Sequence, residues 1–133
     1  MSWFLMLSLT FTAGAIGGVV NALVVWFFGF KGINQMMGVN IAPKMTTGLI
    51  YSKAVWGGLW GLFFVFVSTS DMLFLKAAVI SLAPTVVQLV YVFPKDPLAG
   101  MYGLKLGKLT PAMVVFFNLV WAFVAAAWIY FAI

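Results

Sequence analysis

Four polar side chains interrupt long apolar stretches and are the residues best placed to do chemistry: Asn21, Lys53, Gln88 and Asn118. Amides in such surroundings form interhelical hydrogen bonds worth about 0.6–2 kcal/mol, or they contact a solute. Lys53 lies about seven residues from one end of its apolar stretch, so its stem can carry the ammonium group toward water. These residues are candidates for a polar site, with structural hydrogen bonding as the alternative.

The residue types that usually carry catalysis are missing. The chain has no His and no Cys, so the common ligands of haem, zinc and iron–sulfur clusters are absent, and no Ser or Thr has a His base. Its only acids, Asp71 and Asp96, fall in different connections and form no pair for acid–base work. We therefore expect no enzymatic activity, no cofactor and no metal.

The composition is that of a membrane protein. Hydrophobic residues make up 65% of the 133 and charged residues only 7%, whereas about a quarter of the residues are charged in a soluble domain. The net charge of +5 comes from lysines near the ends of apolar stretches. That placement favours contact with anionic lipid headgroups over nucleic acid.

Four apolar stretches predict a single domain of four transmembrane helices, with spans at about 3–30, 45–67, 72–93 and 110–133. Ser70 and Asp71 predict an N-cap for the third helix. Thr110 followed by Pro111 predicts the start of the fourth, because proline at the first helical position loses no hydrogen bond.

The lysines predict the orientation of the chain. Five of them lie in the first and third connections: Lys31, Lys44, Lys95, Lys105 and Lys108. The second connection and both termini contain none. Basic residues favour the cytoplasmic side. We therefore expect a multi-pass protein of the cell (inner) membrane with both termini on the non-cytoplasmic side and these lysines at lipid headgroups or a partner.

The two halves of the chain resemble each other at an offset of about 65 residues. The ungapped alignment pairs identical landmarks: Met36 with Met101, Gly38 with Gly103, and Trp56 with Trp121. The first and third spans are also weakened at similar depth, by Gly17–Gly18 and by Pro84. This pattern predicts two parallel-repeat helical hairpins related by an axis along the membrane normal; the alternative is that apolar helices of similar length look alike.

Small residues at four-residue spacing predict close helix contacts, because transmembrane helices associate where backbones can approach. The candidates occur on the first, second and fourth spans: Gly14, Gly18, Gly57, Gly61, Ala122 and Ala126. The contacts could lie inside one bundle or between protomers.

In length and number of spans the chain is similar to the small multidrug resistance transporters, but only in size. Those exporters depend on an acidic residue within the first span, and residues 3–30 contain none. The comparison implies that a buried carboxylate does not couple transport to protons here.

Two functions are compatible with these residues. The first is a non-catalytic membrane subunit or assembly partner of a larger membrane complex, favoured by the missing chemistry and the many small and aromatic contact residues. The second is a small homo-oligomeric, uncoupled channel or transporter for a neutral or anionic solute. Partners are in either case the bilayer and other membrane subunits or further copies of the chain.

Overall fold

The computed structural model describes residues 2–67 and 71–133, and every regular element in them is helical. In chain order the elements are α1 (Trp3–Phe30), α2 (Ile33–Met36), α3 (Thr47–Gly61), the 3₁₀ segment η1 (Leu62–Phe66), α4 (Leu73–Val87), the π-helical turn η2 (Gln88–Val92), α5 (Phe93–Lys95), the 3₁₀ turn η3 (Met101–Gly103) and α6 (Thr110–Ala132).

Four helical segments are long and apolar enough to cross a membrane, which confirms the predicted all-helical fold and indicates a multi-pass membrane protein. They are Trp3–Phe30, Thr47–Phe66, Leu73–Lys95 and Thr110–Ala132. The third extends two residues beyond the predicted end at 93. The predicted cap of that segment is wrong for Asp71: α4 begins after Met72, which adopts a positive φ of 61° and makes no side-chain cap. Ser70 lies outside the described residues.

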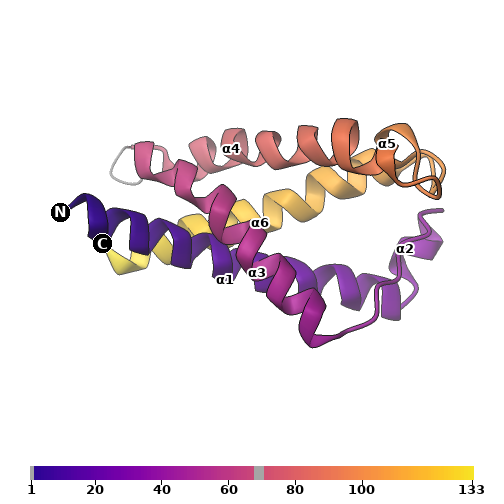
Figure 1. The fold of residues 1–133 in the computed structure, drawn as a ribbon, viewed down its shortest axis with the longest axis horizontal. Coiled ribbons are helices and arrows are strands. Elements are labelled where there is room, and N and C mark those ends of the chain that lie inside the picture. Colours follow the sequence, from indigo (N-terminus) through magenta and orange to yellow (C-terminus); the bar gives the residue numbers. More distant parts are fainter. Residues whose placement is uncertain (1, 68–70) are drawn as a thin grey trace.

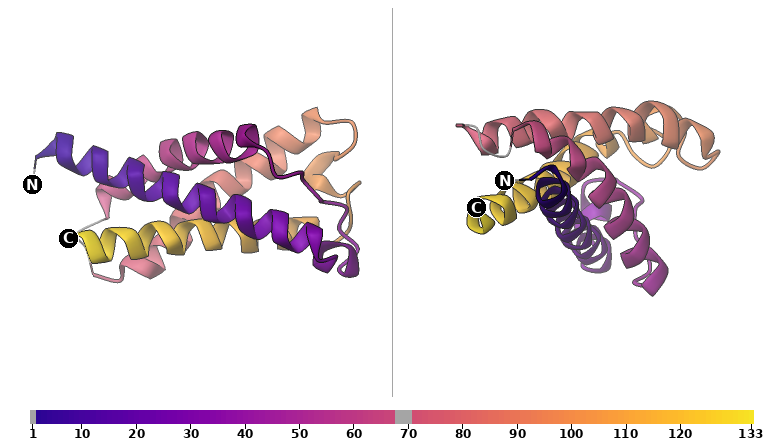
Figure 2. Two further views of the ribbon diagram at one scale, coloured as in Figure 1. Left: turned by 90° about the horizontal axis from the view of Figure 1, so that it is seen from below. Right: turned by 60° about the vertical axis from the view of Figure 1, so that its left-hand side comes forward.

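The helices pass alternately up and down the bundle. Both termini lie at one end, and the long connections 31–46 and 96–109 lie at the other, called the connection end below (Figure 1). α1 and α6 pack together at the centre, with α3 against α1 and α4 against α6. α4 contacts η1, and from there α3 and α4 diverge toward the connection end (Figure 2).

The contact between α1 and α3 is made by the predicted glycines, and it lies within one chain. A Cβ placed on Gly61 would be 2.7 Å from Gly14 Cα, and one on Gly57 would be 2.9 Å from Gly18 Cα. Such distances leave no room for a side chain, so the two backbones touch directly. Ala122 and Ala126 on α6 are fully buried in the main core.

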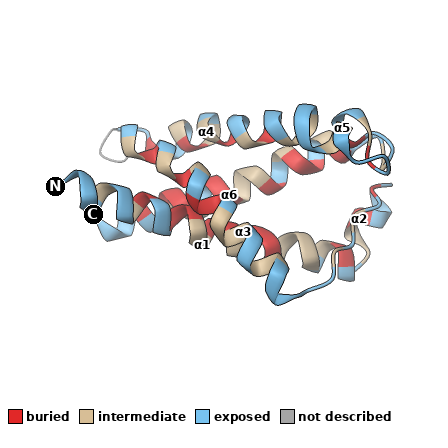
Figure 3. Ribbon diagram, viewed as in Figure 1, coloured by how far each residue is buried: buried red, intermediate tan, exposed pale blue. Residues whose placement is uncertain are grey.

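Two clusters of buried side chains hold the bundle together (Figure 3). The larger lies around Phe64, Trp121 and the small residues of α1, α4 and α6. The smaller joins Val39 of the first connection to Met113 and Phe117 of α6. The first connection is thus packed into the bundle instead of lying loosely over it.

The two long connections are also joined to each other. Asn40 N–H donates a 2.8 Å hydrogen bond to the Leu106 carbonyl, and Gly107 approaches the Gly38 carbonyl too closely for any side chain. Gly38 and Gly103, paired by the predicted repeat, both adopt positive φ, 75° and 68°. The turns share this feature but differ at the preceding residue, where Met37 has a φ of −85° and Tyr102 a φ of 57°.

Other landmarks of the predicted repeat differ. Trp56 is 60% exposed whereas Trp121 is 4% exposed, so the expected matching faces are not found. α1 stays α-helical through Gly17–Gly18, whereas α4 passes into a π-helical turn four residues after Pro84. The 65-residue duplication remains a prediction.

Replacing Gly61 tests the α1–α3 contact. Gly61→Leu should lower the free energy of unfolding by about 1–3 kcal/mol, because its new atoms meet backbone that cannot move aside. Gly48→Leu on the same helix is the matched control, since a Cβ there is 3.8 Å from its nearest neighbour, Thr46 Oγ1. Thermal unfolding in detergent measures both, and equal melting of Gly61→Leu and the control would place this contact elsewhere.

Candidate functional site

The structure brings the four predicted polar residues into one place. Two adjoining cavities, of about 400 Å³ and 680 Å³, both have Asn21, Lys53, Gln88 and Asn118 in their walls. The smaller, here the inner cavity, lies between α3 and α4 over a floor of α1 and α6. The larger, the outer cavity, reaches the connections through Asn40, Ala42 and Leu106. Together they form the polar cleft.

The cleft exists because α3 and α4 diverge above the central pair of helices. Each of the four long segments contributes at least one polar residue to it: Asn21 from α1, Ser52 and Lys53 from α3, Gln88 from η2 and Asn118 from α6. Counted at 1.5 Å per residue from the connection end of each segment, the four predicted residues lie roughly 9–14 Å inside the bundle.

Both asparagines donate hydrogen bonds between helices. Asn21 Nδ2 donates to the Phe117 carbonyl at 2.7 Å, which ties α1 to α6. Asn118 Nδ2 donates to Thr85 Oγ1 at 2.9 Å, which ties α6 to α4. Structural bonding therefore uses their amide nitrogens. Within the described part of the chain their amide oxygens accept no hydrogen bond, so these acceptors remain available to a ligand.

Lys53 and Gln88 differ from the asparagines. Both are half-buried, and neither side chain has a hydrogen-bond partner among residues 2–67 and 71–133. No described carboxylate lies within salt-bridge distance of Lys53. The inner cavity thus contains one ammonium group and one whole amide that the protein itself does not pair.

The π-helical turn places Gln88 at the cleft. Pro84 lacks an N–H and disturbs the regular hydrogen bonding of the helix in which it lies, and the backbone N–H of Gln88 is shared between the Pro84 and Thr85 carbonyls. The following residues, Gln88–Val92, widen into the π turn. Such turns occur frequently at functional sites.

Aromatic side chains form the mouth and the deeper wall of the inner cavity. Trp56 on α3 and Tyr91 on η2 both line it, and they are 60% and 59% exposed, so they stand at its rim. Lys95 Nζ donates a 2.7 Å hydrogen bond to the Tyr91 hydroxyl and lies 3.9 Å from the centre of its ring. A second cation is therefore held beside the mouth.

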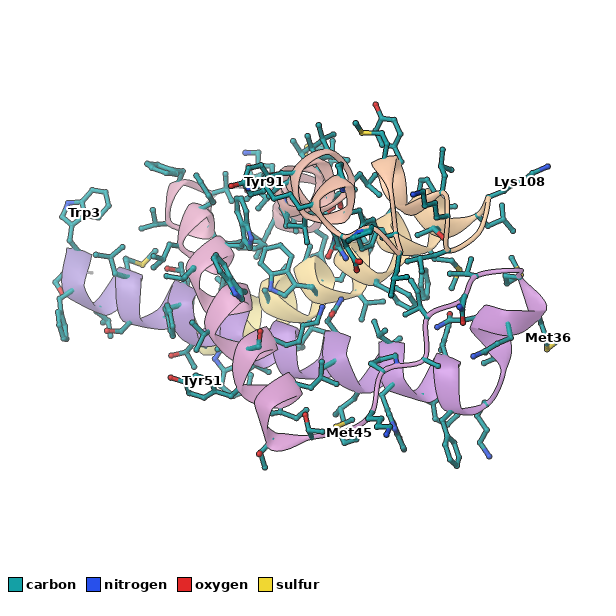
Figure 4. All side chains as sticks on the ribbon, turned by 45° about the vertical axis from the view of Figure 1, so that its right-hand side comes forward. Trp3, Met36, Met45, Tyr51, Tyr91 and Lys108 are labelled. Carbon is teal, nitrogen blue, oxygen red and sulfur yellow. The ribbon has the colours of Figure 1, made fainter. Side chains whose placement is uncertain are left out.

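The predicted headgroup lysines are all exposed and belong to the connection end: Lys31, Lys44, Lys95, Lys105 and Lys108. Figure 4 shows Lys108 and Met36 at this end and Trp3 at the opposite end. Asp96 lines the outer cavity and accepts a hydrogen bond from Leu98 N–H at 2.9 Å. The connection end carries five lysines and one carboxylate, a net charge of +4.

Sequence reasoning missed two residues of the site. Thr85 is 4% exposed and positions Asn118; its place next to Pro84 and three residues before Gln88 put it on the right face of the helix. Trp121 lines the inner cavity and donates a 3.0 Å hydrogen bond from Nε1 to the Gly14 carbonyl. The sequence feature that could have identified Trp121 is its indole N–H, a polar group within an apolar span that needs a hydrogen-bond acceptor.

Comparisons with known proteins do not assign this site. The chain matches no protein-family model, and no curated protein or solved structure is significantly similar to it. Its function has to be argued from the cleft, where the available chemistry is hydrogen bonding by amides and charge pairing by Lys53.

A double-mutant cycle tests the hydrogen bond that shapes the cleft floor. Asn118→Ala and Thr85→Val should each destabilise the protein, and together they should cost less than the sum, with a coupling energy of about 0.6–1.7 kcal/mol. Ser81→Ala is the control partner, because Ser81 Oγ bonds only the Ala78 carbonyl of its own helix. The effects of Ser81→Ala and Asn118→Ala should simply add. If the effects of Thr85→Val and Asn118→Ala also add, the hydrogen bond between Asn118 and Thr85 is contradicted.

Proposed function

We propose that this protein is a small, uncoupled transporter or channel for a neutral or anionic solute and that the polar cleft is its substrate site. The observation that supports this most is the convergence of at least one polar residue from each long helical segment on a single open cleft. Interhelical hydrogen bonding alone would not require a cavity of about 400 Å³ beside them. Ionisable residues within membrane spans typically mark solute pathways.

The charge of the cleft supports the type of solute. Among the residues that line the inner cavity, the ionisable side chains are Lys53 and, at the rim, the phenol of Tyr91. Lys53 lies among the amides. No carboxylate lines that cavity, whereas Asp96 lines the outer one. The inner cavity therefore favours an anion over a cation and offers no acid for proton coupling. A neutral solute would use the amides, and an anionic one would pair with Lys53.

The orientation follows from the lysines. We propose that the connection end faces the cytoplasm of the cell (inner) membrane, because basic residues gather there, and that both termini face the opposite side. The two termini do lie together at one end of the bundle (Figure 1).

The accessory-subunit function is the competing proposal. In that case a helix of a larger complex would fill the space between α3 and α4. Native mass spectrometry after mild extraction separates the two, because a transporter should be recovered as copies of itself and an assembly partner should carry one fixed set of other subunits.

Cysteine labelling tests whether the cleft holds water. The chain has no native Cys, so each variant carries one thiol. Val87→Cys lines the inner cavity, whereas Val79→Cys lies on the same helix, is 62% exposed and lines neither cavity. Because only the thiolate reacts and it forms in water, a sulfonated methanethiosulfonate should label position 87 much faster than position 79 in proteoliposomes.

Two outcomes of this labelling would contradict the proposal. One is equal, slow labelling at both positions, which would show a dry or occupied space. The other is faster labelling of position 87 by a trimethylammonium reagent than by the sulfonate, since Lys53 should favour the anion.

Fusions to the C-terminus test the orientation. Alkaline phosphatase, which folds only outside the cytoplasm, should be active there, and green fluorescent protein exported in unfolded form should be dark. Fusions after Lys108 serve as the control and should show the opposite pair of results. Activity of the phosphatase after Lys108 alone would reverse the topology.

A further inference from the structure

Lys53 lacks the counter-ion that a buried ammonium group needs. A cation removed from water is costly unless it is paired, and no described carboxylate pairs with the half-buried Lys53. The two aspartates of the chain lie in connections, Asp71 at one end and Asp96 at the other. Asp96 lines the outer cavity together with Lys53 but makes no salt bridge to it. A group from outside the chain can supply the counter-ion that the described residues do not.

A second copy of the chain does not provide that partner. Its acids would lie at the same two ends of the bundle, whereas Lys53 lies about 9 Å inside, six residues beyond the start of α3. A small anion or the charged group of a larger molecule is the chemistry that fits.

The inner cavity changes from polar to apolar with depth. Lys53 and Gln88 lie nearer the connection end, and Trp60 lies seven residues further along α3, about 10 Å deeper. The amides of Asn21 and Asn118 lie between these depths, and the deeper lining residues are Pro84, Trp121, Trp60 and two glycines. A ligand that fills this space has one charged end and an apolar body.

The mouth of the cavity opens sideways. Trp56 and Tyr91 stand at its rim on α3 and η2, the two segments that diverge from each other. In a bilayer this opening faces lipid, and Tyr91, four residues from the end of its segment at Lys95, lies at the depth where interfacial Tyr is typical. Lys95, bound to Tyr91 at 2.7 Å, adds positive charge at the rim on the side of the connection end. An anionic molecule already in that leaflet would reach Lys53 without passing through the apolar region.

We infer that the polar cleft binds an anionic amphiphile whose oxyanion, a carboxylate or a phosphate, pairs with Lys53 and whose apolar chain lies along Trp56 and Trp60 toward the lateral opening. This inference rests on the proposed function and names the substrate class of the same cleft. The amide oxygens and Gln88 would add hydrogen bonds to hydroxyl or N–H groups of the head.

Quenching of tryptophan fluorescence tests the inference, because three tryptophans line the cavity. Dibromostearic acid carries a carboxylate and bromine atoms that quench indole, and its methyl ester is the same chain without the charge. In phosphatidylcholine vesicles the acid should quench saturably and more tightly than the ester. Lys53→Gln should weaken binding of the acid about tenfold or more, the value of a charge-assisted hydrogen bond, and should leave the ester unchanged.

Two further variants make the result specific. Lys53→Arg keeps the charge and should retain binding within a few fold. Lys108→Gln removes one charge from an exposed connection and should bind as wild type. Equal binding of acid and ester, or equal effects of Lys53→Gln and Lys108→Gln, would overturn the inference.

Competition distinguishes the source of the oxyanion. Millimolar inorganic phosphate should not displace the brominated acid, because it lacks the chain; full displacement would show a site for a free anion and overturn the amphiphile. The proposed function is judged separately by labelling of Val87→Cys. If Val87→Cys is labelled rapidly but the brominated acid binds no more tightly than its ester, the amphiphile inference is refuted and the proposed function is not.

Discussion

The arrangement depends on the direct backbone contact of α1 with α3. Four glycines, at 14, 18, 57 and 61, remove the side chains that normally hold two helices 8–10 Å apart. At such a contact α3 lies across α1, so one end of it meets α4 through η1 while the other swings away (Figure 1). The cleft is the space that this crossing leaves. It follows that four residues without a side chain determine where the polar side chains of the cleft gather.

Trp121 links that contact to the site. Its indole N–H donates to the Gly14 carbonyl, and a Cβ on Gly57 would be 3.1 Å from the same nitrogen. The ring therefore packs closely against Gly57, where a side chain would crowd it. One turn earlier on α6, Asn118 reaches across to Thr85. Trp121 thus connects α6 to α1, and Asn118 connects α6 to α4. These hydrogen bonds hold the cleft floor on both sides, and losing either would leave a buried polar group unsatisfied, which is costly.

The sequence predicts the spans well because apolar length is a property of each segment alone. It also identifies Asn21, Lys53, Gln88 and Asn118, since polar groups stand out against apolar neighbours. The sequence does not predict that these four residues converge, because helices that are apolar all round give no periodic signal for their rotation. Trp56 and Trp121 illustrate this, because their local sequences are similar although Trp56 is exposed and Trp121 is buried. The π turn at Gln88 depends on how the chain relaxes after Pro84, which composition does not specify.

The polar groups follow an order along the bundle. Exposed lysines mark the connection end, Lys53 and the amides lie roughly 9–14 Å inside, and tryptophans continue from there. A chain that needed lysine only as a topology signal would leave it in the connections, where it is solvated. Placing Lys53 inside, where no described carboxylate pairs with it, costs stability. The proposed function accounts for this cost, because a ligand would supply the missing interaction. The tryptophans beyond the amides favour a ligand that is charged at one end and apolar along the rest.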